Sequence, residues 1–344
     1  MNILYGPRED SLLVTDTYVY SDKLGDDGEK LKLDVYYDPA FADSAMKPVI
    51  INNHGGGWNS TSDRTYLSQL WMRHFAHKGF VCVSIDYREG NEYISNRTYV
   101  PRTYSLHDCF TYATRMAMED VYDATSFVIG LCDRYGADPS KIILTGGSAG
   151  AINSLNAEYG ICNGDELAVE HLPAGFNYAG VVACAGGVWK EGKDAPVWKQ
   201  IPCPILFFHG DVDNAVDINV SSSSSMVDSL MRKGFIITGK VGKKIFAEEP
   251  ENFFGFGPEA LAPGLDACGA SYRFFRFEGG DHSLSTLPYL ISRDEMLRFI
   301  EENVLGGEHV AETLAGNDDG EPRNWAYLPS HKEEMFPEFF AKQE

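Results

Sequence analysis

Residues 141–151 read KIILTGGSAGA, an apolar run that ends abruptly in glycines with one serine between them. Residues 142–144 are typical of a β-strand buried on both faces, and residues 149–159 can continue as a helix. Between them, GGSAG at 146–150 has the spacing of a nucleophile elbow, a strained turn that exposes Ser148 above the first amides of a helix. On its own the stretch also fits a glycine-rich turn in which Ser148 is only a cap.

The segments around this stretch alternate between strand and helix patterns. An antiparallel hairpin is expected over 11–20 and 29–37, and buried strands over 48–53, 80–87, 141–147, 178–183, 204–208 and 271–277. Helices are expected over 64–78, 106–135, 149–159, 221–234, 259–268 and 288–303. This order predicts an α/β fold with a mostly parallel central sheet, an antiparallel N-terminal hairpin and helices on both faces.

The pattern indicates one domain over residues 1–305. Two irregular segments interrupt it, at 88–105 and 235–258, and we interpret them as lid or pocket insertions, with a plain surface loop as the alternative for the first. Residues 306–344 are acidic and contain proline, and we expect an arm that packs, exchanges with a partner or frays.

The composition restricts the classes of function. The chain has 344 residues, 44% of them hydrophobic, which is ordinary for a globular protein and excludes a fibrous or disordered one. Its net charge of −21 disfavours nucleic acid and anionic membrane surfaces as partners. A homo-oligomer is left open.

The cysteines and the N-terminal residues indicate in which cellular compartment the protein is expected. The seven cysteines include no C-x-x-C pair, which indicates buried thiols in a reducing compartment, or at most one or two bridges. No apolar run reaches membrane-spanning length, and MNILYGPRED lacks a basic segment followed by an apolar one. We therefore expect no membrane span and a cytoplasmic protein, or a periplasmic or secreted one if a signal peptide has been removed.

A serine hydroxyl is a weak nucleophile at neutral pH, so Ser148 needs a base within hydrogen-bond reach. Histidine suits this role because its pKa is nearest the working pH. Three histidines follow strands at the edge where the elbow opens, namely His54, His209 and His282. The first two start loops whose backbones they are expected to brace. His282 follows the last strand, in the order Ser, Asp, His of the α/β-hydrolase layout, and is the favoured base.

The group that orients the base is expected in the loop HGDVDNAVD at 209–217, which offers Asp211, Asp213 and Asp217. Asp213 is favoured because the spacing puts it at the loop tip. Asp211 would stabilise the loop. Calcium binding is a poor match, since Val216 occupies the position where an EF-hand loop needs glycine, and we predict neither a metal nor a cofactor.

Another strand end carries HGGGW at 54–58, where three glycines could turn their N–H groups toward a common point or simply form a tight loop. Together with DYR at 86–88, DPSKIILTGGSAG at 138–150, HGDVDNAV at 209–216 and GGDHS at 279–283, this motif resembles the α/β-hydrolases. Within them the chain is similar to the HGGG-type carboxylesterases near the hormone-sensitive-lipase and bacterial xylan side-chain (acetyl and feruloyl) esterase groups. The resemblance covers residues 29–304.

The resemblance implies Ser148 as nucleophile, His282 as base and Asp213 as acid. It also implies an oxyanion hole made by the backbone N–H groups of Gly56, Gly57 and Ala149.

The chain departs from this pattern at three places. Glu-Gly-Asn follows Arg88 where the hormone-sensitive-lipase group has Leu-Ala-Pro-Glu, and Gly147 replaces the Asp common before their serine. Both tilt the match toward the xylan side-chain and general carboxylesterases. The stretch between Asp213 and His282 is also long, because of the segment 235–258.

The expected activity is hydrolysis of short-acyl carboxylic esters through an acyl-enzyme, with carbohydrate-linked acetyl or feruloyl esters as the favoured natural case. Aromatic and basic residues near the predicted site could hold such a substrate, foremost Trp58, Arg88 and Tyr93. One alternative is a serine peptidase or amidase on the same scaffold, but such peptidases often carry a large propeller domain and this chain has no room for one. The other alternative is a hydrolase-like binding protein with an inactive site.

Overall fold

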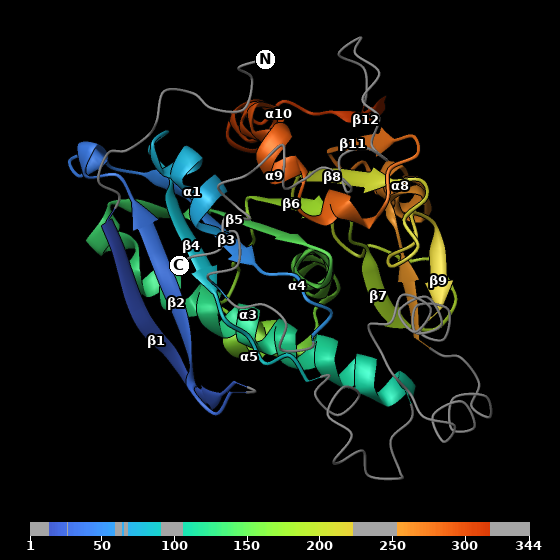
Figure 1. The fold of residues 1–344 in the computed structure, drawn as a ribbon, viewed down its shortest axis with the longest axis horizontal. Helices are drawn as coiled ribbons and strands as arrows, with labels where there is room; N and C mark the ends of the chain where they lie inside the picture. Colours follow the sequence, from blue (N-terminus) through green and yellow to red (C-terminus); the bar gives the residue numbers. More distant parts are fainter. Residues whose placement is uncertain are drawn as a thin grey trace, which may run out of the picture.

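The structure, a computed structural model, describes residues 14–25, 27–58, 64, 68–90, 106–222 and 253–316. Within these residues the central sheet has nine strands in the order β1-β2-β4-β3-β5-β6-β8-β11-β12. The first two pairings, β1 with β2 and β2 with β4, are antiparallel, and every later pairing is parallel. This is the α/β-hydrolase type of sheet that the sequence predicts, N-terminal hairpin included (Figure 1).

The strands of this sheet are β1 Val14–Leu24, β2 Lys30–Tyr37, β3 Lys47–Asn53, β4 Val81–Ile85, β5 Ala137–Gly147, β6 Gly180–Cys184, β8 Ile205–Gly210, β11 Tyr272–Phe277 and β12 Ala311–Ala315. A second, antiparallel sheet has the order β7-β10-β9, with β7 Val188–Glu191, β9 Val220–Ser222 and β10 Phe253–Phe256. The α-helices are α1 Ser68–Ala76, α3 Leu106–Tyr135, α4 Ala149–Asn163, α5 Glu166–His171, α8 Pro258–Cys268, α9 Pro288–Ile291 and α10 Arg293–Phe299. Short 3-10 turns occur at η1 Pro39–Phe41 and η2 His282–Ser285, and a π-helix at η3 Ile300–Leu305.

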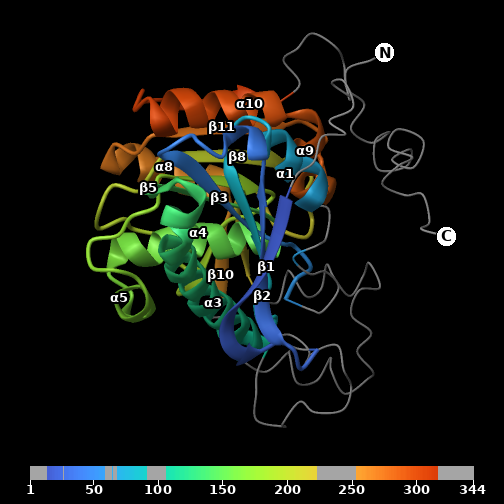
Figure 2. The same ribbon diagram turned by 90° about the vertical axis from the view of Figure 1, so that its left-hand side faces the viewer.

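Helices cover both faces of the central sheet (Figures 1 and 2). Alternate residues of each buried strand enter different cores. In β3, Val49 and Ile51 join the larger cluster under α3 and α4, whereas Ile50 joins the cluster under α1, α9 and α10. Because both faces are packed, the strand sequences are continuous apolar runs rather than alternating ones. The rigid centre of the sheet thus fixes the loops at its carboxyl edge.

Several predicted bounds changed in the structure. Residues 311–315, expected in the C-terminal arm, form β12 and pair in parallel with β11, so part of this segment extends the sheet. Residues 253–256 of the predicted insertion form β10 between β7 and β9. Residues 221–222, expected to start a helix, instead belong to strand β9. The terminal helix is divided at Ser292 between α9 and α10. Residues 91–105, 223–252 and 317–344 lie outside the described residues.

Candidate active site

Ser148 stands between β5 and α4 in a backbone conformation that side chains rarely adopt, with φ 55° and ψ −122°. Its two flanking glycines are required by sterics. A Cβ on Gly146 would lie 2.3 Å from the carbonyl carbon of Gly150, and one on Gly150 would lie 2.0 Å from the carbonyl oxygen of Asn53. Strained conformations of this kind persist only where the surroundings enforce them. The turn therefore has the geometry expected of a nucleophile elbow.

The His282 imidazole joins the serine to a buried carboxylate. Its Nε2 lies 2.9 Å from Ser148 Oγ, and its Nδ1 lies 2.8 Å from Asp213 Oδ2. Asp213 follows β8 and His282 follows β11, and both strands are parallel to β5, so their carboxyl ends meet at one edge of the sheet. A Cβ on Gly210 would lie 2.0 Å from the Gly280 carbonyl oxygen, which shows how closely the two loops approach.

The surroundings of the Asp213 carboxylate favour its ionised form. Its Oδ1 accepts hydrogen bonds from the amides of Ala215 and Val216, at 2.9 and 3.0 Å, which leaves Oδ2 to the imidazole. Burial raises the pKa of Asp213, but the charges and hydrogen bonds of His282, with smaller contributions from His209 and the Val216 amide, outweigh it and hold this pKa below its ordinary value. A permanently charged carboxylate can orient and stabilise an imidazolium.

The other two aspartates of the loop have different partners. Asp211 accepts a hydrogen bond from the Gly279 amide and pairs with Arg276 at 3.0 Å, so it braces the loop as expected. Asp217 accepts from the amide of Asn219.

The two rival histidines also contact loop backbones. His54 Nδ1 lies 2.8 Å from the Gly55 carbonyl oxygen, and its ring stacks on Tyr87 at 4.3 Å. His209 is fully buried, and its Nε2 donates to the carbonyl of Val216. Burial lowers the pKa of His209, although Asp213 acts in the opposite direction.

The glycine loop lies against the elbow. A Cβ on Gly55 would lie 3.0 Å from the Gly147 carbonyl oxygen and 3.6 Å from Ser148 Cβ. The next residues have positive φ, 122° at Gly56 and 67° at Gly57. Ala149 begins α4, so its amide belongs to the first turn, whose N–H groups have no acceptor within the helix. The amides expected to bind an oxyanion thus belong to two segments that meet beside Ser148.

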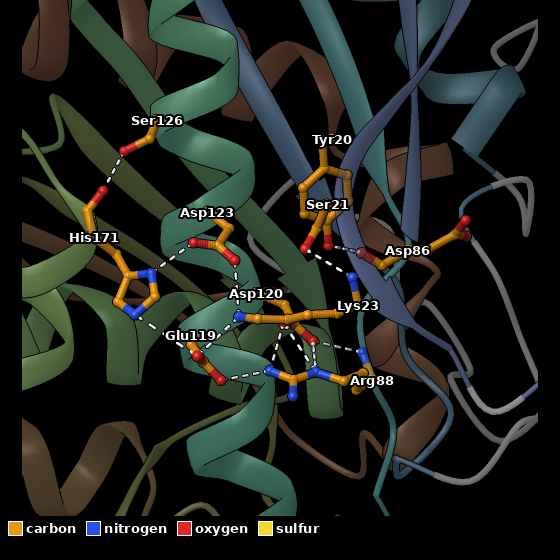
Figure 3. Close-up of polar contacts among 10 residues, drawn as sticks. All are labelled: Tyr20, Ser21, Lys23, Asp86, Arg88, Glu119, Asp120, Asp123, Ser126 and His171. Carbon is orange, nitrogen blue, oxygen red and sulfur yellow. Dashed lines mark hydrogen bonds and ion pairs between the residues drawn. The ribbon is translucent and has the colours of Figure 1, made fainter. Parts of the chain in front are cut away.

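The predicted substrate contacts of two residues do not fit their positions. The Trp58 ring is 1% exposed, and its Nε1 donates to Asn153 Oδ1 at 2.9 Å. The Arg88 guanidinium is held by Asp120 and Glu119 of α3, and Lys23 joins the same cluster from β1 (Figure 3). Each of the two side chains thus donates hydrogen bonds to a buried group of the protein itself, Asn153 for Trp58 and Asp120 for Arg88. Tyr93 lies outside the described residues.

Sequence reasoning missed two contacts at this site. Asn153 anchors the ring of Trp58, and the Tyr87 hydroxyl donates to the carbonyl of His54 at 2.7 Å. A signal for the first was present, since Asn153 is a polar residue on a helix whose neighbours are mostly small and apolar.

Two kinds of feature are absent from the part of the chain that the structure describes. No group of three or more His, Cys, Asp or Glu side chains there is arranged to hold a metal ion. No helix there has the length and hydropathy to cross a membrane.

The sheet order and the elbow are those of the α/β-hydrolase fold, and Ser148, His282 and Asp213 meet at the carboxyl edge of its sheet. A family model described as BD-FAE matches residues 33–101. Two proteins of Mycobacterium tuberculosis are similar in sequence. The probable carboxylic ester hydrolase LipM is 32% identical over 135 residues, 39% of this chain and 26% of the relative. Esterase LipQ is 32% identical over 128 residues, 37% of this chain and 25% of the relative. The match thus spans about a quarter of the length of these relatives.

Solved structures with a similar fold include esterase 2 of Thermogutta terrifontis. Its apo form has a TM-score of 0.52 and 18% identity, over 84% of this chain and 94% of that one. The form of the same esterase phosphoramylated by tabun has a TM-score of 0.50 and 19% identity, over 83% of this chain and 94% of that one. At such identities the likeness concerns the fold.

Proposed function

We propose that this protein is a serine carboxylesterase that hydrolyses short-acyl esters through an acyl-enzyme. The observation that carries the proposal is the continuous pair of hydrogen bonds from Ser148 Oγ to His282 and from His282 to Asp213, 2.9 and 2.8 Å long. The names of the two mycobacterial relatives, a probable carboxylic ester hydrolase and an esterase, support the same reaction class.

In the proposed reaction, Ser148 Oγ attacks the ester carbonyl while its proton passes to His282 Nε2. The amides of Gly56, Gly57 and Ala149 stabilise the resulting oxyanion. Collapse of the tetrahedral intermediate breaks the bond to the alcohol oxygen, which takes the proton from His282, and Ser148 stays acylated. Water then loses a proton to His282 and attacks the acyl carbon, and the second collapse releases the acid and returns the proton to Ser148.

A short acyl group is favoured by the packing beside the nucleophile. Ala149 and Ile152 of α4 belong to a buried cluster with Trp58, Phe110 and Trp189. This cluster is buried and closely packed on its side of α4, and we therefore propose a short acyl chain. A carbohydrate-linked acetyl or feruloyl ester remains the proposed natural substrate, on the strength of the aromatic and basic residues in 88–105.

The test is a rate comparison on p-nitrophenyl acetate, butyrate and octanoate, with acetylated and feruloylated xylan and a p-nitroanilide added to the panel. We expect the acetate to be hydrolysed fastest and the anilide hardly at all. Ser148→Ala should fold normally and lose about 10⁶-fold in kcat, and a fluorophosphonate should label Ser148 in the unmodified protein only. Hydrolysis by Ser148→Ala at the unmodified rate would exclude the mechanism, and a faster anilide would indicate an amidase.

A further inference from the structure

The glycine loop is held at both of its ends. At its start, the Tyr87 hydroxyl donates to the carbonyl of His54 at 2.7 Å, and the two rings stack. At its far end, the indole Nε1 of Trp58 donates to Asn153 Oδ1 at 2.9 Å, and both side chains are buried. Between these anchors lie the glycines whose amides the proposed mechanism uses.

The far anchor restrains a strained segment. Trp58 has φ 57°, a left-handed conformation that a bulky side chain rarely adopts, and it directly follows Gly56 and Gly57, whose φ values are also positive. Such a conformation needs a contact that enforces it. The buried bond to Asn153 is such a contact, and the edge-to-face packing of Trp58 against Phe110 adds to it.

Asn153 is also rigidly placed relative to the nucleophile. It lies in α4, the helix that starts directly after Ser148 with Ala149. The glycine loop contains two of the expected oxyanion donors, Gly56 and Gly57, and helix α4 contains the third, Ala149. The hydrogen bond from Trp58 to Asn153 therefore links this loop to this helix.

One polar atom of Asn153 is buried at a cost in free energy. Its Nδ2 is buried and has no hydrogen-bond partner among the described residues. A buried donor without an acceptor costs free energy, so a residue kept only for stability would more favourably be apolar here.

We propose that Asn153 is a positioning residue for the oxyanion hole, acting through Trp58 to hold the amides of Gly56 and Gly57 at the distance that the transition state requires. This inference rests on the proposed esterase function. It predicts that loss of the bond slows the chemical step more than it weakens substrate binding, because the oxyanion exists only in the transition state.

The experiment measures kcat and KM on p-nitrophenyl acetate, together with the midpoint of thermal unfolding, for four single variants and one double variant. Asn153→Leu removes the acceptor, and Asn153→Asp keeps an oxygen facing Trp58. Trp58→Phe removes the donor and keeps an aromatic ring. Tyr122→Phe is the matched control, since it deletes one buried hydroxyl that donates to the Ala157 carbonyl of the same helix at 2.8 Å.

We expect kcat to fall roughly tenfold to a hundredfold in Asn153→Leu and Trp58→Phe, with KM changed less than about threefold. Asn153→Asp should keep more of kcat than Asn153→Leu, and Tyr122→Phe should stay within about twofold of the unmodified enzyme. The double variant Asn153→Leu/Trp58→Phe leaves no unpaired polar group at this contact. Its unfolding midpoint should recover while kcat stays low.

A kcat within twofold of normal in Asn153→Leu and in Trp58→Phe would overturn the inference, and so would a double variant whose kcat recovers along with its midpoint. If Asn153→Leu does not fold, Trp58→Phe and the double variant decide the question. Failure of the esterase proposal looks different, because the unmodified protein would then hydrolyse no ester or Ser148→Ala would stay active, and the inference would fall with it.

Discussion

Nε2 of His282 lies 2.9 Å from Oγ of Ser148, although 134 positions separate the two residues in the sequence. The contact follows from the arrangement of parallel strands, since β5 delivers Ser148 and β11 delivers His282 to the same edge of the sheet. Asp213 reaches this edge from β8, which pairs with β11. The proposed chemistry therefore depends on how loops approach one another, and the predictions below test these approaches.

The Asp213→Asn variant should lose about 10³- to 10⁴-fold in kcat while KM and stability change little. The amide keeps an oxygen for the amides of Ala215 and Val216, but its NH₂ group would face His282 Nδ1 and favour the wrong tautomer. Steady-state kinetics on p-nitrophenyl acetate measure the effect. Asp211→Asn is the control, and we expect less than about a threefold loss from it. Equal losses in the two variants would contradict the assigned roles.

The Gly147→Ala variant should move the turn that carries His282 away from the elbow. An added Cβ would lie 1.9 Å from the carbonyl oxygen of Ser285, a backbone atom that cannot yield without a shift of η2. We expect a loss of roughly tenfold to a hundredfold in kcat and of about 1–3 kcal/mol in stability. The same contact offers a reason why this chain has glycine where the hormone-sensitive-lipase group has Asp.

Gly130→Ala in α3 is the matched control for Gly147→Ala. A Cβ there meets nothing within 4 Å, and the residue lies inside a helix, so we expect stability to rise by about 1 kcal/mol without a change in kcat. Urea unfolding and kinetics on both variants provide the comparison. Normal activity in Gly147→Ala would show that the turn can shift without harm to the site.

The stability of the protein should fall on acidification because of His209. Burial lowers the pKa of this side chain below the ordinary histidine value of about 6.5. The folded state therefore binds the proton less readily than the unfolded chain. This stabilising contribution is complete above pH about 6.5 and is lost as the pH falls toward the lowered pKa, by at most about 1.4 kcal/mol per pH unit.

The measurement compares urea unfolding of the unmodified protein and His209→Gln at pH 7, 6 and 5. Glutamine can still donate to the carbonyl of Val216, which His209 Nε2 contacts at 2.9 Å, but does not titrate. The free energy of unfolding should decline less steeply in the variant. Parallel declines would show that other groups account for the acid sensitivity.

The Arg88→Met variant should destabilise the protein and leave KM for small esters nearly unchanged. In the unmodified protein the Arg88 guanidinium lies 2.7 Å from Asp120, whose side chain is 0% exposed, and Lys23 Nζ lies 3.5 Å from the same carboxylate (Figure 3). Burial raises the pKa of Asp120, although Arg88 lowers it. Loss of the arginine should cost about 3 kcal/mol, because it leaves a buried charge poorly paired.

The double variant Arg88→Met/Asp120→Asn should regain part of this stability, which chemical denaturation can measure. If instead Arg88→Met raises KM more than tenfold and does not change the unfolding midpoint, the original prediction of a substrate contact for Arg88 is restored.

Much of the architecture was predictable because buried parallel strands leave continuous apolar runs in the sequence. The elbow strand, the long helix over residues 106–135 and the N-terminal hairpin were all expected and are present. The strand of residues 311–315 was not expected, because its alternating exposed pattern at the sheet edge lacks the buried run that marks the central strands. Its place depends on pairing with β11, which is a long-range contact.

The sequence by itself determined the α/β layering and a short set of candidate residues, because hydrophobic periodicity and glycine spacing are local properties of the chain. Only the tertiary structure showed that Asp213, and not Asp211 or Asp217, contacts His282. It also paired the side chains of Trp58 and Arg88 with Asn153 and Asp120 inside the protein. Those outcomes depend on which side chains meet across different strands and helices, and spacing along one chain does not encode that directly.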